Sequence, residues 1–313
     1  MEHNSLRNAL RNKIFQEQVP VKVSICTITY NHCNYIRECI EGFLEQETDF
    51  RVEIIIHDDA SNDGTTKIIN EYASRYPSII RIITQSENQY SRGVNPYYAF
   101  VFPVAQGDYI AICDGDDYWN DPNKLTTQVT LLENEKDTSI VYGPVKAIDA
   151  NGNEVAHSGG ARWDLSPNEL KSAPAINTLT VCFRNIFKNT PPPIFLRNSP
   201  IGDLTVWCLL GYHGRGRYLA DLPPATYRVH NGGILSLVDP NKQKLMSAIA
   251  YLNIAAYNSD RKDITASVNA LKKAINLINR TGIAHYFDAD TNVFKQMINL
   301  CKTKLKRWGA KPH

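Results

Sequence analysis

Residues 108–117 read DYIAICDGDD, an apolar run that stops abruptly at three aspartates. Residues 52–59, VEIIIHDD, repeat the same design. Consecutive apolar positions are typical of strands that are buried on both faces of a parallel sheet. Parallel strands end at one edge of their sheet, and ligands bind beyond those carboxyl ends. Both runs therefore predict a polar site at one edge of a parallel sheet.

Strand-like and helix-like segments alternate outward from these two runs. Strands are expected at 21–29, 79–84 and 139–143, and helices follow around Ile36–Leu44, Ile68–Tyr72 and residues 125–135. A helix is also expected behind the long connection 85–96. This alternation predicts an α/β fold with a mostly parallel sheet flanked by helices. The pattern does not predict the order of the strands.

The chain divides into three regions by character. Residues 1–19 form an N-terminal extension, residues 20–238 hold the α/β domain, and residues 239–313 have helical periodicity and form a C-terminal helical appendage. The end of the appendage, CKTKLKRWGAK at 301–311, is basic. It fits either a solvated helix face or peripheral contact with an anionic membrane.

Composition narrows the class of protein. Of 313 residues, 43% are hydrophobic and the net charge is +2, which gives no indication of a nucleic-acid partner. No apolar run approaches the roughly 20 residues that span a bilayer, and the polar start lacks a signal-peptide core. A cytoplasmic protein is expected. The seven cysteines show no C-x-x-C pair, so buried thiols are expected; Cys33 beside His32 does not make a zinc site.

The aspartates raise a question of charge. If the two strands lie close together, five carboxylates face one crevice, and their repulsion favours a bound Mg²⁺ or Mn²⁺. Alternatively, the aspartates only end strands and cap helices. Residues 59–64 begin like an EF-hand loop, but Asn70 stands where its glutamate is needed and a strand precedes it. Ser61 and Asp63 are expected to cap the following helix instead.

Three motifs in order carry a family resemblance: SICTITYNHCNYIRECIEGFLEQ (24–46), EIIIHDDASNDGT (53–65) and GDYIAICDGDDYWNDPNKL (107–125). Together they resemble the family 2 glycosyltransferases of the GT-A fold, over roughly residues 21–235. The resemblance implies transfer of a sugar from a nucleotide-diphospho-sugar with inversion at the anomeric carbon. By analogy with bacterial relatives, the acceptor is expected to be a glycan or a lipid-linked molecule of surface polysaccharide synthesis.

The resemblance also implies which residues bind the donor. Tyr30 would line or stack on the base, unless it is a half-buried tyrosine at a strand end. Asp59 would accept a hydrogen bond from the base, which favours uridine, and Asp58 would support it. Asp114 would hold the ribose or the waters of a metal ion. Arg228 would reach the diphosphate.

For the metal, the resemblance implies Asp116 as the most direct ligand, with Asp114 and His230 beside it. The ion would be Mg²⁺ or Mn²⁺. His230 as a purely structural histidine is the competing interpretation. Asp117 is expected to support the loop, and Trp119 is expected to pack beneath it.

The family needs a general base, usually within an acidic pair that opens a late helix. Here Gly202-Asp203 stands in that place, so Asp203 is the candidate base and Gly202 departs from the common pattern. A plain helix cap is the alternative for Asp203. Because of Gly202, a nucleotide-sugar-binding protein without catalysis stays open. A sugar nucleotidyltransferase is disfavoured, because the segment TYNHCNYI has no glycine or lysine to cradle phosphates.

Overall fold

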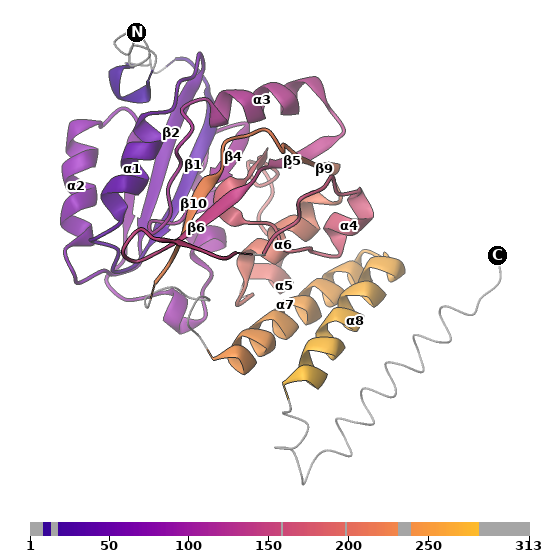
Figure 1. Cartoon of the computed structure of the whole chain (residues 1–313). Helices are drawn as coiled ribbons and strands as arrows, with labels where there is room; N and C mark the ends of the chain where they lie inside the picture. Colours follow the sequence, from indigo (N-terminus) through magenta and orange to yellow (C-terminus); the bar gives the residue numbers. More distant parts are fainter. Residues whose placement is uncertain (1–8, 14–17, 158, 198, 231–238, 282–313) are drawn as a thin grey trace, which may run out of the picture.

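A mostly parallel sheet forms the centre of the protein. The computed structural model describes residues 9–13, 18–157, 159–197, 199–230 and 239–281. Within them the main sheet has the order β3-β2-β1-β4-β8-β5-β9, and only β8 runs antiparallel to its neighbours (Figure 1). This arrangement confirms the predicted α/β fold. The strands are β1 (Val21–Thr29), β2 (Arg51–Asp58), β3 (Ile80–Thr84), β4 (Tyr109–Ile112), β5 (Thr138–Tyr142), β8 (Cys182–Arg184) and β9 (Arg215–Tyr218).

Both faces of this sheet are covered, which explains the continuous apolar runs. On β2, Ile54 and Ile56 belong to one buried cluster and Ile55 to the other. The cluster with Ile54 and Ile56 includes side chains of three helices, and the cluster with Ile55 includes side chains of the segment 97–104 and of residues 202–210. Successive side chains of a strand point to opposite faces, so a strand buried on both sides needs apolar residues throughout. The helices of the first face are α1 (Ile36–Leu44), α2 (Thr65–Arg75) and α3 (Lys124–Asn134); on the second lie α4 (Pro167–Lys171), α5 (Ile194–Arg197) and α6 (Gly202–Leu210).

The connection between β3 and β4 differs from the expected helix. It contains a 3₁₀ turn η3 (Tyr90–Arg92), a five-residue π-helix η4 (Tyr97–Val101) and a 3₁₀ turn η5 (Phe102–Val104). Pro103 lies just after the π-helix, and proline removes a backbone donor and clashes with a preceding turn. A longer regular helix is therefore blocked in this segment.

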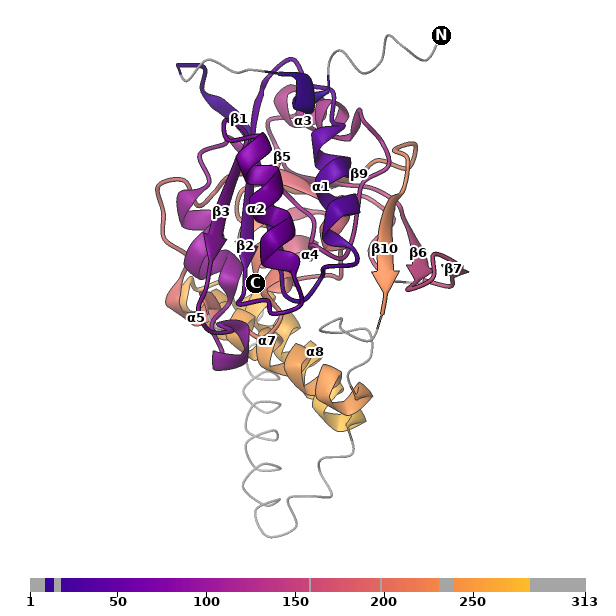
Figure 2. The ribbon, with the colours of Figure 1, turned by 90° about the vertical axis from the view of Figure 1, so that its left-hand side faces the viewer.

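A smaller sheet stands beside the main one. It has the order β10 (Ala225–Val229), β6 (Val145–Asp149), β7 (Glu154–Val155), and it lies at one side of the molecule (Figure 2). Thr226 on β10 forms a bridge with Tyr118, with backbone N–H to O distances of 2.9 and 3.2 Å. This bridge fastens the end of β10 to the loop that follows β4.

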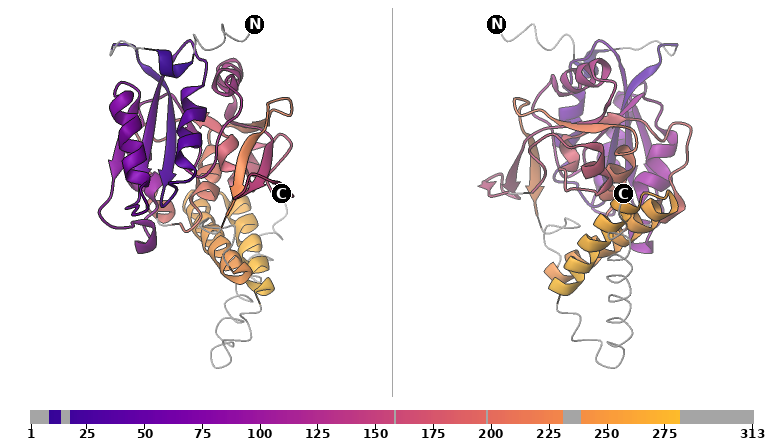
Figure 3. Two further views of the ribbon diagram at one scale, coloured as in Figure 1. Left: turned by 60° about the vertical axis from the view of Figure 1, so that its left-hand side comes forward. Right: turned by 90° about the vertical axis from the view of Figure 1, so that its right-hand side faces the viewer.

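Helices α7 (Pro240–Asp260) and α8 (Ile264–Arg280) form a hairpin that packs on the α5–α6 side (Figures 1 and 3). Asp263 caps α8 and pairs with Lys171 at 3.0 Å. None of the described helices is long and apolar enough to cross a membrane. The basic end 301–311 lies outside the described residues.

Part of the N-terminal extension packs against the α/β domain. The short turn η2 (Leu10–Asn12) buries Leu10 completely, and its N–H donates to the carbonyl of Gln46 at 2.9 Å. Arg11 pairs with Glu41 of α1 at 2.8 Å. These contacts join the extension to the first helix.

Candidate active site

Three loops meet at the carboxyl edge of the sheet, as the order β2-β1-β4 requires. Asn31 links the first two: its N–H donates to Ser61 Oγ at 2.9 Å, and its Oδ1 accepts from Asn62 N–H at 2.9 Å. Asp63 accepts from Cys33 N–H at 2.9 Å and from Thr65 N–H at the start of α2 at 2.9 Å. Asp63 thus accepts the first N–H of α2, but the N-cap residue is Gly64, and Ser61 bonds Asn31 and Asp58 instead of the helix, so the expected capping by Ser61 is wrong. The first two loops form one connected surface.

Asp58 and Asp59 end β2, but their carboxylates turn to separate partners. Asp58 is 1% exposed and accepts from Ser61 and from the hydroxyl of Thr66 in α2. Asp59, also 1% exposed, accepts from Gln89 N–H at 2.8 Å and Tyr90 N–H at 3.0 Å. The expected convergence of five carboxylates on one crevice is therefore corrected. Hydrogen-bond donors compensate these two charges locally, because each acid holds a loop of its own.

The loop after β4 is pressed against the end of β1. Gly115 donates its N–H to the carbonyl of Ile28 at 2.9 Å, and a Cβ at Gly115 would lie 2.8 Å from Thr29 Oγ1. Contacts under 3.0 Å are sterically forbidden there, so only glycine lets the loop come this close. The aspartates on either side of Gly115 are thereby turned in different directions.

Asp114 points to the segment between β3 and β4. Its Oδ1 accepts from the hydroxyl of Tyr97 at 2.6 Å. Burial raises the pKa of Asp114 to about 7, and the negative charges of Asp116 and Asp203 add to the shift. The Tyr97 hydroxyl opposes it by donating to the carboxylate. Asp114 therefore holds a proton more readily than an exposed aspartate does, chiefly because it is buried.

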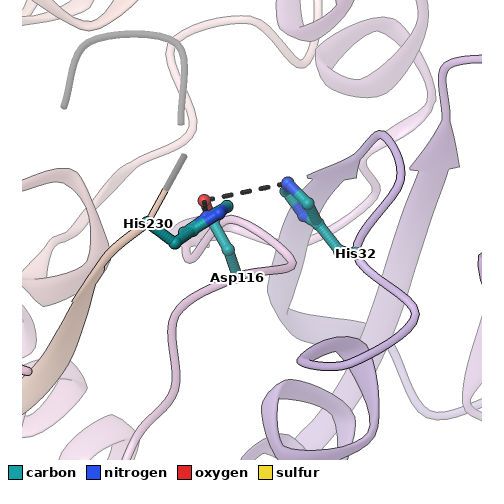
Figure 4. A group of neighbouring side chains, drawn as sticks. All are labelled: His32, Asp116 and His230. Carbon is teal, nitrogen blue, oxygen red and sulfur yellow. Dashed lines mark hydrogen bonds and ion pairs between the residues drawn. The ribbon is translucent and has the colours of Figure 1, made fainter. Parts of the chain in front are cut away.

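Asp116 meets two histidines from distant parts of the chain (Figure 4). Its Oδ2 lies 2.9 Å from Nε2 of His230, which directly follows β10, and 3.7 Å from Nε2 of His32 in the loop after β1. One ligand atom from each of the three residues lies within 4.8 Å of the others. A carboxylate with two imidazoles is a donor set that divalent transition-metal ions bind. Such an ion fits these residues.

Electrostatics keep this group in the form that binds a cation. Burial raises the pKa of Asp116, but the hydrogen bond to His230 and the charges of the two imidazoles outweigh it, and the net shift is downward. Burial lowers the pKa of His32, and the charge of Asp116 offsets part of that shift. An ionised carboxylate beside a neutral imidazole is the state that ligates metal ions.

The sequence motifs do not indicate His32 as a site residue, and its neighbour Cys33 suggests only a zinc pair, which two adjacent residues do not make. Its position does indicate a site residue: His32 follows the end of β1, and the DGDD run follows the end of the neighbouring strand β4, so both lie at the same edge of the sheet. The histidine is only 9% exposed, and the carbonyl of the same residue accepts N–H bonds from Tyr35 and Ile36 at 2.9 Å each. The start of α1 therefore fixes its place.

Arg228, expected at the diphosphate, is committed elsewhere. Its Nη2 pairs with Glu38 of α1 at 2.6 Å, and its Nε donates to the carbonyl of Asp116 at 3.0 Å. The guanidinium lies over the rings of Tyr35 and Tyr118, 4.7 and 5.5 Å from their centroids. With 6% of its surface exposed, Arg228 holds the loop after β4 and α1 together. The expected contact of Arg228 with the diphosphate is therefore replaced by a positioning role: the side chain links Glu38 to the backbone of Asp116.

The remaining loop residues follow the expected pattern. Asp117 is 5% exposed and accepts from Arg228 N–H at 2.9 Å; burial and the charge of Asp116 raise its pKa well above the usual value. Trp119 is 3% exposed, stacks edge-on against Phe43 and donates to the carbonyl of Leu179 at 2.7 Å. Both are structural supports. Tyr30 is 42% exposed, so its ring is accessible to a ligand.

Asp203 lies in the first turn of α6. Its Oδ1 accepts from its neighbour Leu204 N–H at 2.7 Å, and its Oδ2 accepts from the hydroxyl of Thr178 at 3.3 Å. Burial raises the pKa of Asp203 to about 6, although both hydrogen bonds oppose the shift. A carboxylate with this pKa is suited to accept a proton near neutral pH.

Packing against Asn95 explains why a glycine stands at position 202. A Cβ at this position would lie 2.0 Å from Nδ2 of Asn95, which is 7% exposed. Oδ1 of the same asparagine accepts from Tyr98 N–H, and the Tyr98 hydroxyl bonds Thr205 of α6 at 2.8 Å. The space of the usual acidic side chain is therefore occupied by Asn95.

Sequence comparison places this architecture in a family. Residues 24–189, just over half of the chain, match the model of glycosyl transferase family 2. The chain belongs to that family, and its fold is the GT-A fold. The uncharacterized protein Rv1520 of Mycobacterium tuberculosis is 36% identical over 263 residues, covering 79% of this chain and 73% of that protein.

Two solved structures share the fold. TarS 1–349 of S. aureus, crystallised with UDP-GlcNAc, has a TM-score of 0.57 at 17% identity, covering 87% of this chain and 78% of that one. The mannosyltransferase PcManGT of Pyrobaculum calidifontis, solved with GDP-Man and Mn²⁺, has a TM-score of 0.53 at 16% identity, covering 95% of this chain and 87% of that one.

Proposed function

We propose that this glycosyltransferase moves a sugar from a nucleotide-diphospho-sugar, a UDP-sugar in the first instance, to a hydroxyl of a glycan or lipid-linked acceptor, with inversion. The observation that carries the proposal is the group His32, Asp116 and His230 at the carboxyl edge of a GT-A sheet. Donor sites lie at this edge in open α/β sheets. The nucleotide sugars bound to TarS and PcManGT support a donor of this class.

Asp116 and His230 would hold a divalent cation, Mg²⁺ or Mn²⁺. When bound there, the cation would screen the diphosphate and stabilise it as a leaving group. The Mn²⁺ in the PcManGT complex supports a metal-dependent reaction. Tyr30, half exposed at the end of β1, is the candidate stacking surface for the base, and Asp59 the candidate acceptor of a base N–H.

Asp203 is the proposed general base. The acceptor oxygen would attack the anomeric carbon from the face opposite the diphosphate, and the bond from that carbon to the diphosphate would break. The acceptor proton would pass to the carboxylate of Asp203, whose pKa of about 6 leaves it ionised at neutral pH. This accounts for inversion without a covalent intermediate.

The alternative without catalysis rests on Gly202. Because Asn95 fills the space beside Gly202, the absence of an acid there has a packing explanation. The nucleotidyltransferase alternative lacks support, since no glycine-rich basic loop follows β1.

A donor screen tests the proposal. Nucleotide sugars are incubated with the full chain, with and without Mn²⁺, and thermal stabilisation and donor hydrolysis are measured. We expect one sugar nucleotide to stabilise the protein, more strongly with metal. Stabilisation by none of them would contradict the proposed donor class.

A further inference from the structure

The ring of His32 is buried without hydrogen bonds. Its Nδ1 is inaccessible to solvent and unpartnered, and its Nε2 is 3.7 Å from Asp116 Oδ2, which is beyond hydrogen-bond reach. Among the described residues, no hydrogen bond reaches this ring. Burying an imidazole without a hydrogen-bond partner costs free energy of folding, so a role for His32 has to be sought.

The nearest polar groups supply one. His32, Asp116 and His230 come from the ends of β1, β4 and β10, and Figure 4 shows the three side chains converging on one point. The two imidazole rings lie edge to face with centroids 5.8 Å apart. We propose that His32 is the third protein ligand of the metal ion. The site then has two histidines and one aspartate, and it prefers Mn²⁺ or a similar transition-metal ion over Mg²⁺.

The preference follows from the ligands. Mg²⁺ binds oxygen ligands and gives up its waters reluctantly, whereas imidazole nitrogen suits transition metals. A site built on aspartates alone would accept Mg²⁺ readily. Replacing one carboxylate ligand with a second imidazole moves the preference toward Mn²⁺.

Asp114, the other expected ligand, is held away from this group. Its Oδ1 accepts from the Tyr97 hydroxyl at 2.6 Å, and Asp114 is not among the three described residues that converge. The third ligand position therefore falls to a residue from the loop after β1. That loop also carries Tyr30, so metal and base would be held by one segment.

The inference rests on the proposed metal-dependent function, and its test uses Mn²⁺ itself. Electron paramagnetic resonance measures free Mn²⁺ during titration of the full chain, with and without UDP. Pulsed measurements on the bound ion then report the number of coordinated imidazole nitrogens. We expect two nitrogens in the wild type and one in His32→Phe, which keeps an aromatic ring in place.

The variant should bind Mn²⁺ at least about 10-fold more weakly and lose its preference over Mg²⁺ in competition. His57→Phe is the matched control, because His57 is also fully buried and stacks on Phe100, but lies outside the group. It should retain wild-type Mn²⁺ affinity.

The outcomes separate the two ideas. If the wild type shows one coordinated nitrogen, or His32→Phe binds Mn²⁺ as the wild type does while Asp116→Ala does not, His32 is no ligand and the proposed function stands. If the wild type binds no Mn²⁺ with or without UDP, both the third ligand and the metal-dependent mechanism are overturned. The wild-type nitrogen count decides the question even where a variant fails to fold.

Discussion

Nε2 of His230 lies 2.9 Å from Oδ2 of Asp116, although 114 positions separate the two residues. The contact exists because the backbone of Thr226 bridges Tyr118, and because Asp117 accepts the N–H of Arg228 at 2.9 Å. These hydrogen bonds hold the strand β10 against the loop that follows β4. The candidate metal site is assembled by this fastening.

Asp203→Asn should separate binding from transfer. The amide cannot accept the acceptor proton, so we expect kcat to fall by about 10²- to 10⁴-fold while donor affinity stays unchanged. Steady-state kinetics and calorimetry with the donor measure the two quantities. A variant as fast as the wild type would show that Asp203 is not the base.

The same residue predicts the acid limb of the pH profile. The base must be ionised, and the pKa of Asp203 is about 6, so kcat/KM should fall below about pH 6. The pKa is raised by folding, so the carboxyl group stabilises the protein less as pH rises from 4 through 6. At pH 8 the free energy of unfolding of Asp203→Asn should therefore exceed that of the wild type by about 3 kcal/mol. A difference in unfolding free energy between the variant and the wild type that is the same at pH 4 and at pH 8 would contradict the raised pKa of Asp203.

Arg228→Lys tests positioning of the metal-binding loop. An ammonium cannot reproduce the pair with Glu38, the bond to the Asp116 carbonyl and the stacking on Tyr35 together. We expect a loss of about 2–3 kcal/mol in unfolding free energy and weaker Mn²⁺ binding. Arg37→Lys is the control: its pair with Glu71 at 3.0 Å is exposed and should matter little. Denaturant titration and Mn²⁺ titration give both readings.

Gly202→Ala should destabilise the protein by about 1–3 kcal/mol, because the new Cβ meets Nδ2 of Asn95 at 2.0 Å. Gly202→Asp, which restores the common acidic pair, should therefore lower activity. In a double-mutant cycle, Asn95→Ser should recover part of the loss in Gly202→Ala. Strictly additive losses would show that the two side chains do not compete for space.

Asp58 and Asp59 should differ in what they control. Asp59→Asn keeps one acceptor oxygen but places an amide N–H₂ against the N–H of either Gln89 or Tyr90, and it weakens the acceptor proposed for the base, so UDP affinity should drop. Asp58→Asn disturbs only the link to Ser61 and Thr66, so it should cost mainly stability. Calorimetry with UDP and thermal unfolding of both variants make the comparison. Equal effects of both changes on UDP affinity would contradict this division.

Local patterns in the sequence were enough to predict the fold class, although not the order of the strands. Consecutive apolar residues in β1, β2 and β4 require two covered faces, and this local pattern predicts a parallel sheet whose carboxyl edge bears Asp58, Asp59 and the run after Ile112. The resemblance to the family, carried by three ordered motifs, implied Asp203 as the acid that opens a late helix. Such signals lie within short segments, so they can be read without knowing how the segments pack.

The roles of these residues depend on contacts between distant parts of the chain. Which carboxylates are free depends on donors from other segments, such as Gln89 for Asp59 and Tyr97 for Asp114. The convergence of His32 with Asp116 and His230 depends on β10 lying against the loop after β4. Contacts between residues far apart in the chain leave no local periodicity, and for that reason the sequence alone could not choose His32 over Asp114.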